Sequence, residues 1–176
     1  MGLYNERRKL ARTYERIQAF PHKENRNALL DYLTMLEING RKPLRVAKVG
    51  TVLAQLAQMW GDKPFTEGTQ HDVMRVMREF NQRNLSKQTI SSYMVIIREF
   101  FRHIGNAEAV DWMRPPTEYN YKTEEDILTY DEVRRMIEAA THPRDRALIA
   151  LLYESGGRAS EVGNMLIEDV ELTSYG

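Results

Sequence analysis

Arg158 has the clearest potential for chemistry in this sequence, because it follows two glycines at the end of an apolar helical stretch, residues 144–155. Gly156–Gly157 has no Cβ atoms, so it permits left-handed backbone and ends the helix. A second, short amphipathic helix is predicted directly after it, with Ser160 as a cap and Glu161 in its first turn. Arg158 is therefore expected at a tight corner between two helices, beside a helix N-terminus, where an anion is favoured.

The corner and its flanks resemble the first arginine box of the tyrosine recombinase (phage integrase) family, whose pattern reads roughly R-D-x-A-L-x-x-L-L-Y-x-(S/T)-G-x-R-x-S-E-x-x-x-L-x-x-x-D. The positions in register are Arg144, Asp145, Ala147, Leu148, Leu151, Leu152, Tyr153, Ser155, Gly156, Arg158, Ser160, Glu161 and Asp169. The match is specific because polar residues and apolar period agree over more than twenty positions. Residues 128–133 are similar to the L-T-x-x-E-V opening of the family's catalytic domain. The resemblance is strongest to archaeal and Xer-like integrases and covers roughly residues 20 to 176.

The resemblance implies site-specific DNA recombination or integration by an enzyme that breaks and rejoins DNA. In this family a tyrosine attacks a DNA phosphodiester to form a covalent phosphotyrosine. Arg158 would hold the non-bridging oxygens, since its planar, permanently charged fork donates two parallel hydrogen bonds. Glu161 resembles the acidic residue that supports this arginine. Without the surrounding family pattern, Arg158 would be interpreted as an ordinary exposed arginine. Arg158 and Glu161 would then be interpreted as a surface ion pair. The resemblance implies neither a cofactor nor a metal.

The remaining catalytic groups of the family have no match in this sequence. Each histidine is followed at the third position by a residue other than arginine, namely Asn25, Met74, Asn106 and Asp145. Residues 172–176 resemble the first strand and turn of the β-hairpin region that carries the catalytic lysine. That lysine, the His-x-x-Arg box and the nucleophile are therefore expected beyond Gly176, and Tyr175 lies in the wrong place to be the nucleophile. The chain is expected to be truncated within the catalytic domain and inactive alone.

The composition excludes several other classes of protein. The 176 residues include no cysteine, which excludes disulfides and cysteine-based zinc sites and favours a reducing compartment. No apolar run reaches the roughly 20 residues that a membrane span needs, and the first residues do not form a signal sequence, so a cytoplasmic protein is expected. The sequence contains no Gly-x-Gly-x-x-Gly, P-loop or internal repeat, which argues against nucleotide hydrolysis and solenoid folds.

The net charge of zero hides an uneven distribution along the chain. Residues 1–118 contain 19 Lys and Arg against 13 Asp and Glu, whereas residues 119–176 contain 6 against 12. The N-terminal part is therefore the predicted nucleic-acid surface. A basic excess of this size also occurs on helical domains as a solvated face.

Apolar residues at helical spacing predict helices at 4–19, 24–39, 44–60 and about 69–81, followed by one that ends at Gly105–Asn106. The last helix resembles one in the family's core-binding domain, with Thr89, Ile97, Arg98, Phe100 and Phe101 in register. Residues expected to be buried in this bundle are Leu33, Val49, Leu53, Val76, Ile97 and Phe100.

These elements predict a mainly α protein with two domains. A SAM-like helical core-binding (DNA-binding) domain is expected at 1–112 and a linker with Pro115–Pro116 at 113–127. The helical start of the truncated catalytic domain follows at 128–176. Thr129 is predicted to cap its first helix, with Glu132 at the spacing of a capping box.

The core-binding domain is expected to lay its helices across double-stranded DNA and to contact phosphates and base edges. Candidate contacts are Arg41, Lys42, Arg45, Lys48, Lys87, Gln88, Thr89 and Ser91, each of which could instead be a solvated side chain. The intact enzyme is expected to be a homo-oligomer, a tetramer on paired DNA sites. Two other functions fit the sequence: a non-catalytic DNA-binding accessory or regulatory protein derived from an integrase, and a helical protein-interaction module with no nucleic-acid role.

Overall fold

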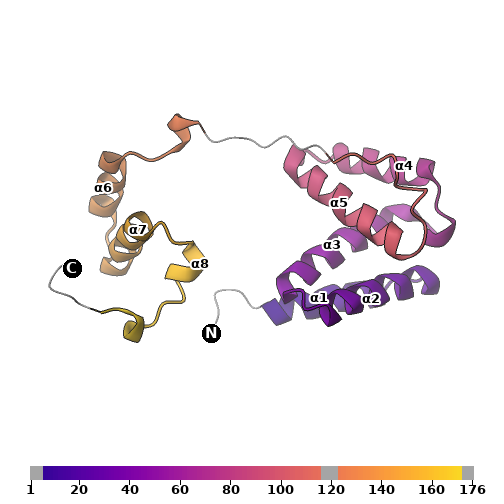
Figure 1. The fold of residues 1–176 in the computed structure, drawn as a ribbon, viewed down its shortest axis with the longest axis horizontal. Helices are drawn as coiled ribbons and strands as arrows, with labels where there is room; N and C mark the ends of the chain where they lie inside the picture. The colour runs from indigo at the N-terminus through magenta and orange to yellow at the C-terminus, as the bar shows by residue number, and fades with distance from the viewer. Residues whose placement is uncertain (1–5, 116–122, 172–176) are drawn as a thin grey trace. The chain divides into compact units, whose positions relative to one another are not determined.

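The computed structural model describes residues 6–115 and 123–171, and its regular elements in those ranges are all helical (Figure 1). In the first range lie α1 (Glu6–Gln18), α2 (Lys23–Ile38), α3 (Pro43–Trp60), η1 (Phe65–Glu67), α4 (Gln70–Asn81) and α5 (Lys87–His103). In the second lie η2 (Glu124–Asp126), α6 (Tyr130–Ala139), α7 (Pro143–Ser155), α8 (Ala159–Val162) and η3 (Ile167–Asp169). The predicted mainly α fold class is confirmed, and the strand expected at 172–176 lies outside the described residues.

The described residues divide into two compact units, one within 6–115 and the other within 123–171. In the first unit α3 is the central helix, because it packs against α1, α2, α4 and α5 (Figure 1). Val46, Val49, Leu53 and Leu56 recur at helical spacing along α3 and are buried. An apolar surface on several sides of one helix requires that its neighbours surround it.

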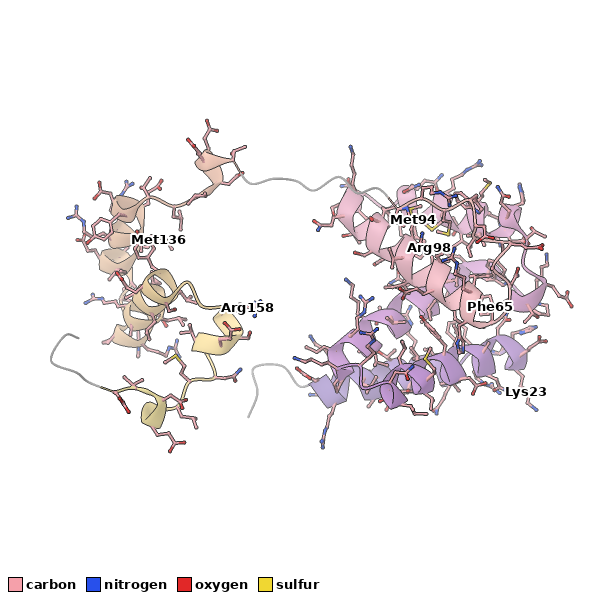
Figure 2. The ribbon with its side chains drawn as sticks, in the orientation of Figure 1. Lys23, Phe65, Met94, Arg98, Met136 and Arg158 are labelled. Atoms are coloured by element: carbon pink, nitrogen blue, oxygen red, sulfur yellow. The ribbon has the colours of Figure 1, made fainter. Side chains whose placement is uncertain are left out.

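Aromatic side chains fill the core where the end of α3 meets α5. Phe65, which is labelled in Figure 2, belongs to η1. Its ring lies edge-on to that of Phe100, with centroids 5.3 Å apart and an interplanar angle of 88°, and its centroid is 5.2 Å from that of Trp60. The buried Asn25 of α2 fixes the segment that follows α3. Its Nδ2 donates to the carbonyl of Lys63 at 2.9 Å, and its Oδ1 accepts the N–H of Phe65 at 2.8 Å. Its amide group is therefore satisfied on both sides, as a buried polar group must be.

The burial expected from the apolar pattern is confirmed in the first unit. The six side chains that the sequence placed in the core are each at most 3% exposed: Leu33, Val49, Leu53, Val76, Ile97 and Phe100. Met113 is also fully buried, although it lies one residue beyond the predicted domain end at 112. The packed chain therefore continues past the point at which helical spacing ends.

The second unit begins with the predicted capping box. Thr129 Oγ1 accepts the N–H of Glu132, and the Glu132 carboxylate accepts the N–H of Thr129 at 2.8 Å. The helices α6 and α7 pack against each other, with the Tyr130 and Tyr153 rings 6.2 Å apart. Among the side chains described between 123 and 171, Val133 alone is buried. This unit therefore has a much smaller core than the first.

Candidate nucleic-acid interface and arginine corner

Arg158 lies at a corner between α7 and α8, as its sequence context predicts. The helix α7 ends at Gly156, which adopts the left-handed conformation with φ of +59°. Arg158 has extended backbone and immediately precedes α8 (Figure 2). Glu161 binds it twice: Oε1 accepts from Arg158 Nη1 at 2.8 Å and Oε2 accepts from the Arg158 backbone N–H at 2.9 Å. One carboxylate thus fixes both the backbone and the guanidinium of Arg158.

The guanidinium remains open to a ligand, because the Arg158 side chain is 84% exposed despite its pairing with Glu161. The prediction that Ser160 caps the second helix is wrong. The helix starts at Ala159, Arg158 occupies the cap position, and the Ser160 carbonyl accepts from Asn164 Nδ2. A helix of four residues also has little dipole of its own. An anion at this corner would therefore be held mainly by the Arg158 side chain.

A second arginine of the box, Arg144, lies in the first turn of α7. Its Nε and Nη2 donate to Asp145 Oδ1 at 3.0 and 2.9 Å, and its backbone N–H donates to His142 Nδ1. The Arg144 side chain is 79% exposed, so this ion pair contributes little to stability. The His142 ring, which accepts the N–H, acts as the cap of α7.

In the first unit, the side chains at the start of α5 face the middle of α3 across a hollow, which we call the α3–α5 hollow. Its lining residues are Lys48, Thr51, Val52, Ser86, Gln88, Thr89, Ser92 and Tyr93. Lys48 is its single charged side chain, and the other polar groups are hydroxyls and one amide. Such neutral donors and acceptors are the groups that read base edges, whereas a lysine reaches phosphates.

The structure brings together three of the predicted DNA contacts, Lys48, Gln88 and Thr89, in this hollow. Thr89 is already engaged, since its hydroxyl lies 2.8 Å from Ser86 Oγ and its N–H donates to the same atom. The other five candidates do not line this hollow: Arg41, Lys42, Arg45, Lys87 and Ser91.

Arg41 and Arg45 are exposed and lie near Tyr32 of α2. Burial, followed by the charge of Glu99, raises the pKa of Tyr32 to about 12, and the positive charges of Arg45 and Arg41 act in the opposite direction. Lys42 is exposed just before α3, and Lys87 is exposed at the start of α5. The predicted contacts thus lie at several places on the unit instead of forming one cluster.

The sequence reasoning missed a second hollow, between α1 and α3, which we call the α1–α3 hollow. Its lining residues are Lys9, Arg12, Thr13, Arg16, Leu44, Ala47, Lys48 and Thr51. The three cations of α1 recur at i, i+3 and i+7, which places them on one side of that helix. This spacing was the available signal, but the high overall charge of α1 hid it.

Two classes of site are not found in the described part of the chain. Among the residues of the ranges 6–115 and 123–171, no group of three or more His, Cys, Asp or Glu side chains is placed to hold a metal ion. Nor is any helix in these ranges both long and apolar enough to cross a membrane.

Comparison with known proteins agrees with the arginine box. No protein-family model matches the chain, and no solved structure matches it significantly. The chain is 24% identical over 151 residues to the tyrosine recombinase XerA of Thermococcus kodakarensis, covering 85% of this chain and 51% of that protein. It is 28% identical over 144 residues to XerA of Pyrococcus furiosus, covering 81% and 48%. It is 29% identical over 120 residues to the tyrosine recombinase XerD of Bifidobacterium longum, covering 61% and 38%.

The chain is therefore related to the tyrosine recombinases over most of its length. It spans about half the length of the XerA proteins that it matches.

Proposed function

We propose that this chain functions in site-specific DNA recombination, as the DNA-binding and arginine-bearing part of a tyrosine recombinase. The observation that carries the proposal is the Arg158 corner: an exposed guanidinium, fixed by Glu161, stands within a segment that matches the family's arginine box. The XerA and XerD relatives, which are named as tyrosine recombinases, support this reading.

The role of Arg158 in this proposal is to hold the phosphoryl group of the scissile DNA strand. Its two parallel N–H groups match two non-bridging oxygens, and the charge on those oxygens must be held through the transition state. Glu161 acts as a positioning residue, because its carboxylate accepts from Nη1 and from the backbone N–H and thereby limits the rotamers of Arg158.

Binding of double-stranded DNA is assigned to the first unit. The α3–α5 hollow offers one lysine and several neutral polar groups. Further basic side chains are exposed elsewhere on this unit, at Arg41, Lys42, Arg45 and Lys87. The recombinase would assemble as a homo-oligomer, a tetramer on paired DNA sites, as the family resemblance implies.

Residues 1–176 alone are proposed to bind DNA without cleaving it, because the sequence contains no His-x-x-Arg box. The test is a denaturing gel after incubation of the chain with a nicked suicide duplex, beside a binding titration on the same duplex. Binding without a covalent adduct is expected. An adduct would show that the chain holds its own nucleophile, whereas absence of binding at low salt would remove the DNA-binding function itself.

A further inference from the structure

We propose that Ser155 is a positioning residue for Arg158, because its hydroxyl holds the joint between α7 and α8 at Gly157. This inference rests on the function proposed for Arg158 and names a further residue on which that function depends. Ser155 is the last residue of α7 and lies three positions before Arg158.

The Ser155 hydroxyl makes two hydrogen bonds at the end of α7. It donates to the carbonyl of Leu151, one turn earlier, and it accepts the N–H of Gly157 at 3.1 Å. A hydroxyl has one hydrogen to donate and two lone pairs, so both bonds form at once. Where a helix ends at a left-handed glycine, as α7 does at Gly156, the N–H groups that follow commonly return to carbonyls of the last turn. The Gly157 N–H binds a side chain instead, so the corner depends on the residue type at position 155.

The peptide planes on both sides of Gly157 are each held by a side chain. Ser155 holds the N–H of Gly157, and Glu161 holds the N–H of Arg158 at 2.9 Å. The two backbone angles of Gly157 connect these planes, and an unrestrained glycine rotates more freely than any other residue. Glu161 fixes Arg158 to α8, and the bond to Ser155 fixes the same segment to α7. Together they hold the direction in which Arg158 leaves the corner.

The packing at Gly157 is equally close. A Cβ atom there would lie 3.0 Å from Ser155 Oγ and 3.2 Å from Cγ2 of Val162 on α8. Position 157 therefore fits between the end of α7 and α8. Because the Arg158 side chain is long, a small rotation at Gly157 displaces the guanidinium by a larger distance, and a misplacement of about 1 Å can cost about 100-fold in rate.

The first test measures the backbone of the corner in the 176-residue chain. Ser155→Thr keeps the hydroxyl, and Ser155→Val has nearly the same shape without it, so the two form a matched pair. Ser155→Ala removes the hydroxyl with a residue that favours helix. Ser160→Ala is a control at the same corner, where the Ser160 carbonyl is the group that accepts a hydrogen bond. Relaxation of the amide ¹⁵N nuclei gives order parameters for Gly157 and Arg158 in each protein.

The order parameters should separate the variants by their hydroxyl at position 155. In the wild type, Ser155→Thr and Ser160→Ala they should be near the value of rigid backbone, about 0.85, and in Ser155→Val and Ser155→Ala they should fall toward about 0.6. Because Ser155 is exposed, the other amide signals of α7 should show that the helix remains folded. Equal order parameters in Ser155→Thr and Ser155→Val, or a corner that is already mobile in the wild type, would overturn the proposal.

The second test measures coupling to Arg158 in a protein extended to the length of the XerA relatives. Ser155→Val should slow formation of the phosphotyrosine adduct by about three- to tenfold, the effect of one hydrogen bond, and Ser155→Thr should stay near the wild type. In an Arg158→Ala background, Ser155→Val should have no further effect, since no guanidinium remains to be positioned. A residue that only stabilises the fold would give the same fold-change in both backgrounds, and that result would exclude the positioning role.

Failure of the two proposals gives different results. If Arg158→Ala reduces adduct formation and Ser155→Val does not, the role of Ser155 is wrong and the function proposed for Arg158 stands. If Arg158→Ala forms the adduct like the wild type, both are wrong.

Discussion

Gly50 of α3 lies directly under the methyl group of Thr13 on α1, where a Cβ atom would approach Thr13 Cγ2 to 2.4 Å and Leu33 Cδ1 to 2.9 Å. Thr13 cannot move away easily, because it is 7% exposed and its hydroxyl donates to the carbonyl of Lys9 at 3.0 Å. The absence of a side chain at position 50 therefore sets the distance between the two helices.

Gly50→Ala is expected to lower the free energy of unfolding by about 1–3 kcal/mol, the usual cost of overpacking a well-packed core. The overlap should outweigh the gain of about 1 kcal/mol that alanine brings to a helix. Urea denaturation measures the change. In the double variant with Thr13→Ala, the loss should be smaller than the sum of the two single losses, since the clashing methyl group is gone. Strict additivity would contradict the contact.

Asp72 should contribute stability that disappears in acid. Lys63, at 2.8 Å, is the main cause that holds the pKa of the Asp72 carboxyl well below its usual range, followed by the hydroxyl and N–H of Thr69. Because the folded-state pKa is below the unfolded value of about 3.9, the contribution is present above pH ~4 and is lost as the pH falls below it. Asp72→Asn should lower stability at pH 7 by about 1 kcal/mol, given that Lys63 is partly exposed.

The check is a series of denaturation curves from pH 7 to pH 2, in which Asp72→Asn should show a flatter acid limb than wild type. Glu132→Gln is the control, because Glu132 forms the equivalent capping box with Thr129 in the other unit. An unchanged acid limb in the Asp72 variant would show that the ion pair does not contribute.

Ionisation of the Tyr32 hydroxyl should reduce the stability of the fold in alkali. Burial is the main cause that raises its pKa to about 12 from the ordinary value of 10.0. A group with a raised folded-state pKa contributes stability below the unfolded pKa and loses it as the pH rises toward the folded value, so stability should fall between pH 10 and 12. Tyr32→Phe keeps the edge-on contact with Phe100, at 5.5 Å, and should flatten this fall. Denaturant midpoints measured from pH 8 to pH 12 for both proteins would show it.

Lys42 and Lys48 should contribute to DNA binding through phosphates. Replacing both by glutamine should weaken binding to a duplex and reduce the salt slope by about 1–2. The same change at Arg134 and Arg135 of α6 should have a smaller effect, because Arg134 already lies near Asp131 and Glu138, at 3.7 and 3.9 Å. Anisotropy titrations at two salt concentrations distinguish the pairs, and equal effects would argue against a localised DNA surface.

Arg158 should matter for strand cleavage and not for folding. In a protein extended to the length of the XerA relatives, Arg158→Ala should reduce formation of the phosphotyrosine adduct by several orders of magnitude. Arg158→Lys should restore little, because an ammonium cannot make the two parallel hydrogen bonds. Adducts are counted on a denaturing gel. In the 176-residue chain, the same substitutions should leave the melting temperature and DNA binding almost unchanged, since the side chain is 84% exposed.

The helices and the core could be predicted because their signals are local. The apolar period places Leu53 and Phe100 in the core. Thr129 and Glu132, three residues apart, have the spacing of a capping box and so predict a helix start. The cap of α8 could not be predicted by the same rule. The preference for serine at helix starts favours Ser160, but the Glu161 carboxylate accepts the N–H of Arg158, and the helix starts two residues earlier.

The binding surface was predicted less well than the helices, because it depends on which helices become neighbours. Lys48 and Gln88 are 40 positions apart in the sequence, and only the packing of α5 on α3 brings them to one hollow. The cations of α1 join Lys48 only because Gly50 allows α1 to approach. Arg41 and Arg45 carry the expected charge and lie near Tyr32, but neither of them lines either hollow.

The sparse core of the second unit has a consequence for hydrogen exchange. With Val133 as its buried side chain among those described, little free energy opposes local opening of α6–α8, and their amides should exchange with solvent while the first unit remains folded. The N–H of Phe65, by contrast, is buried and held by Asn25 across 40 residues of chain, so it exchanges only when the first unit unfolds as a whole. In the native chain without denaturant, the amides of the second unit should therefore take up deuterium faster than the core amides of the first.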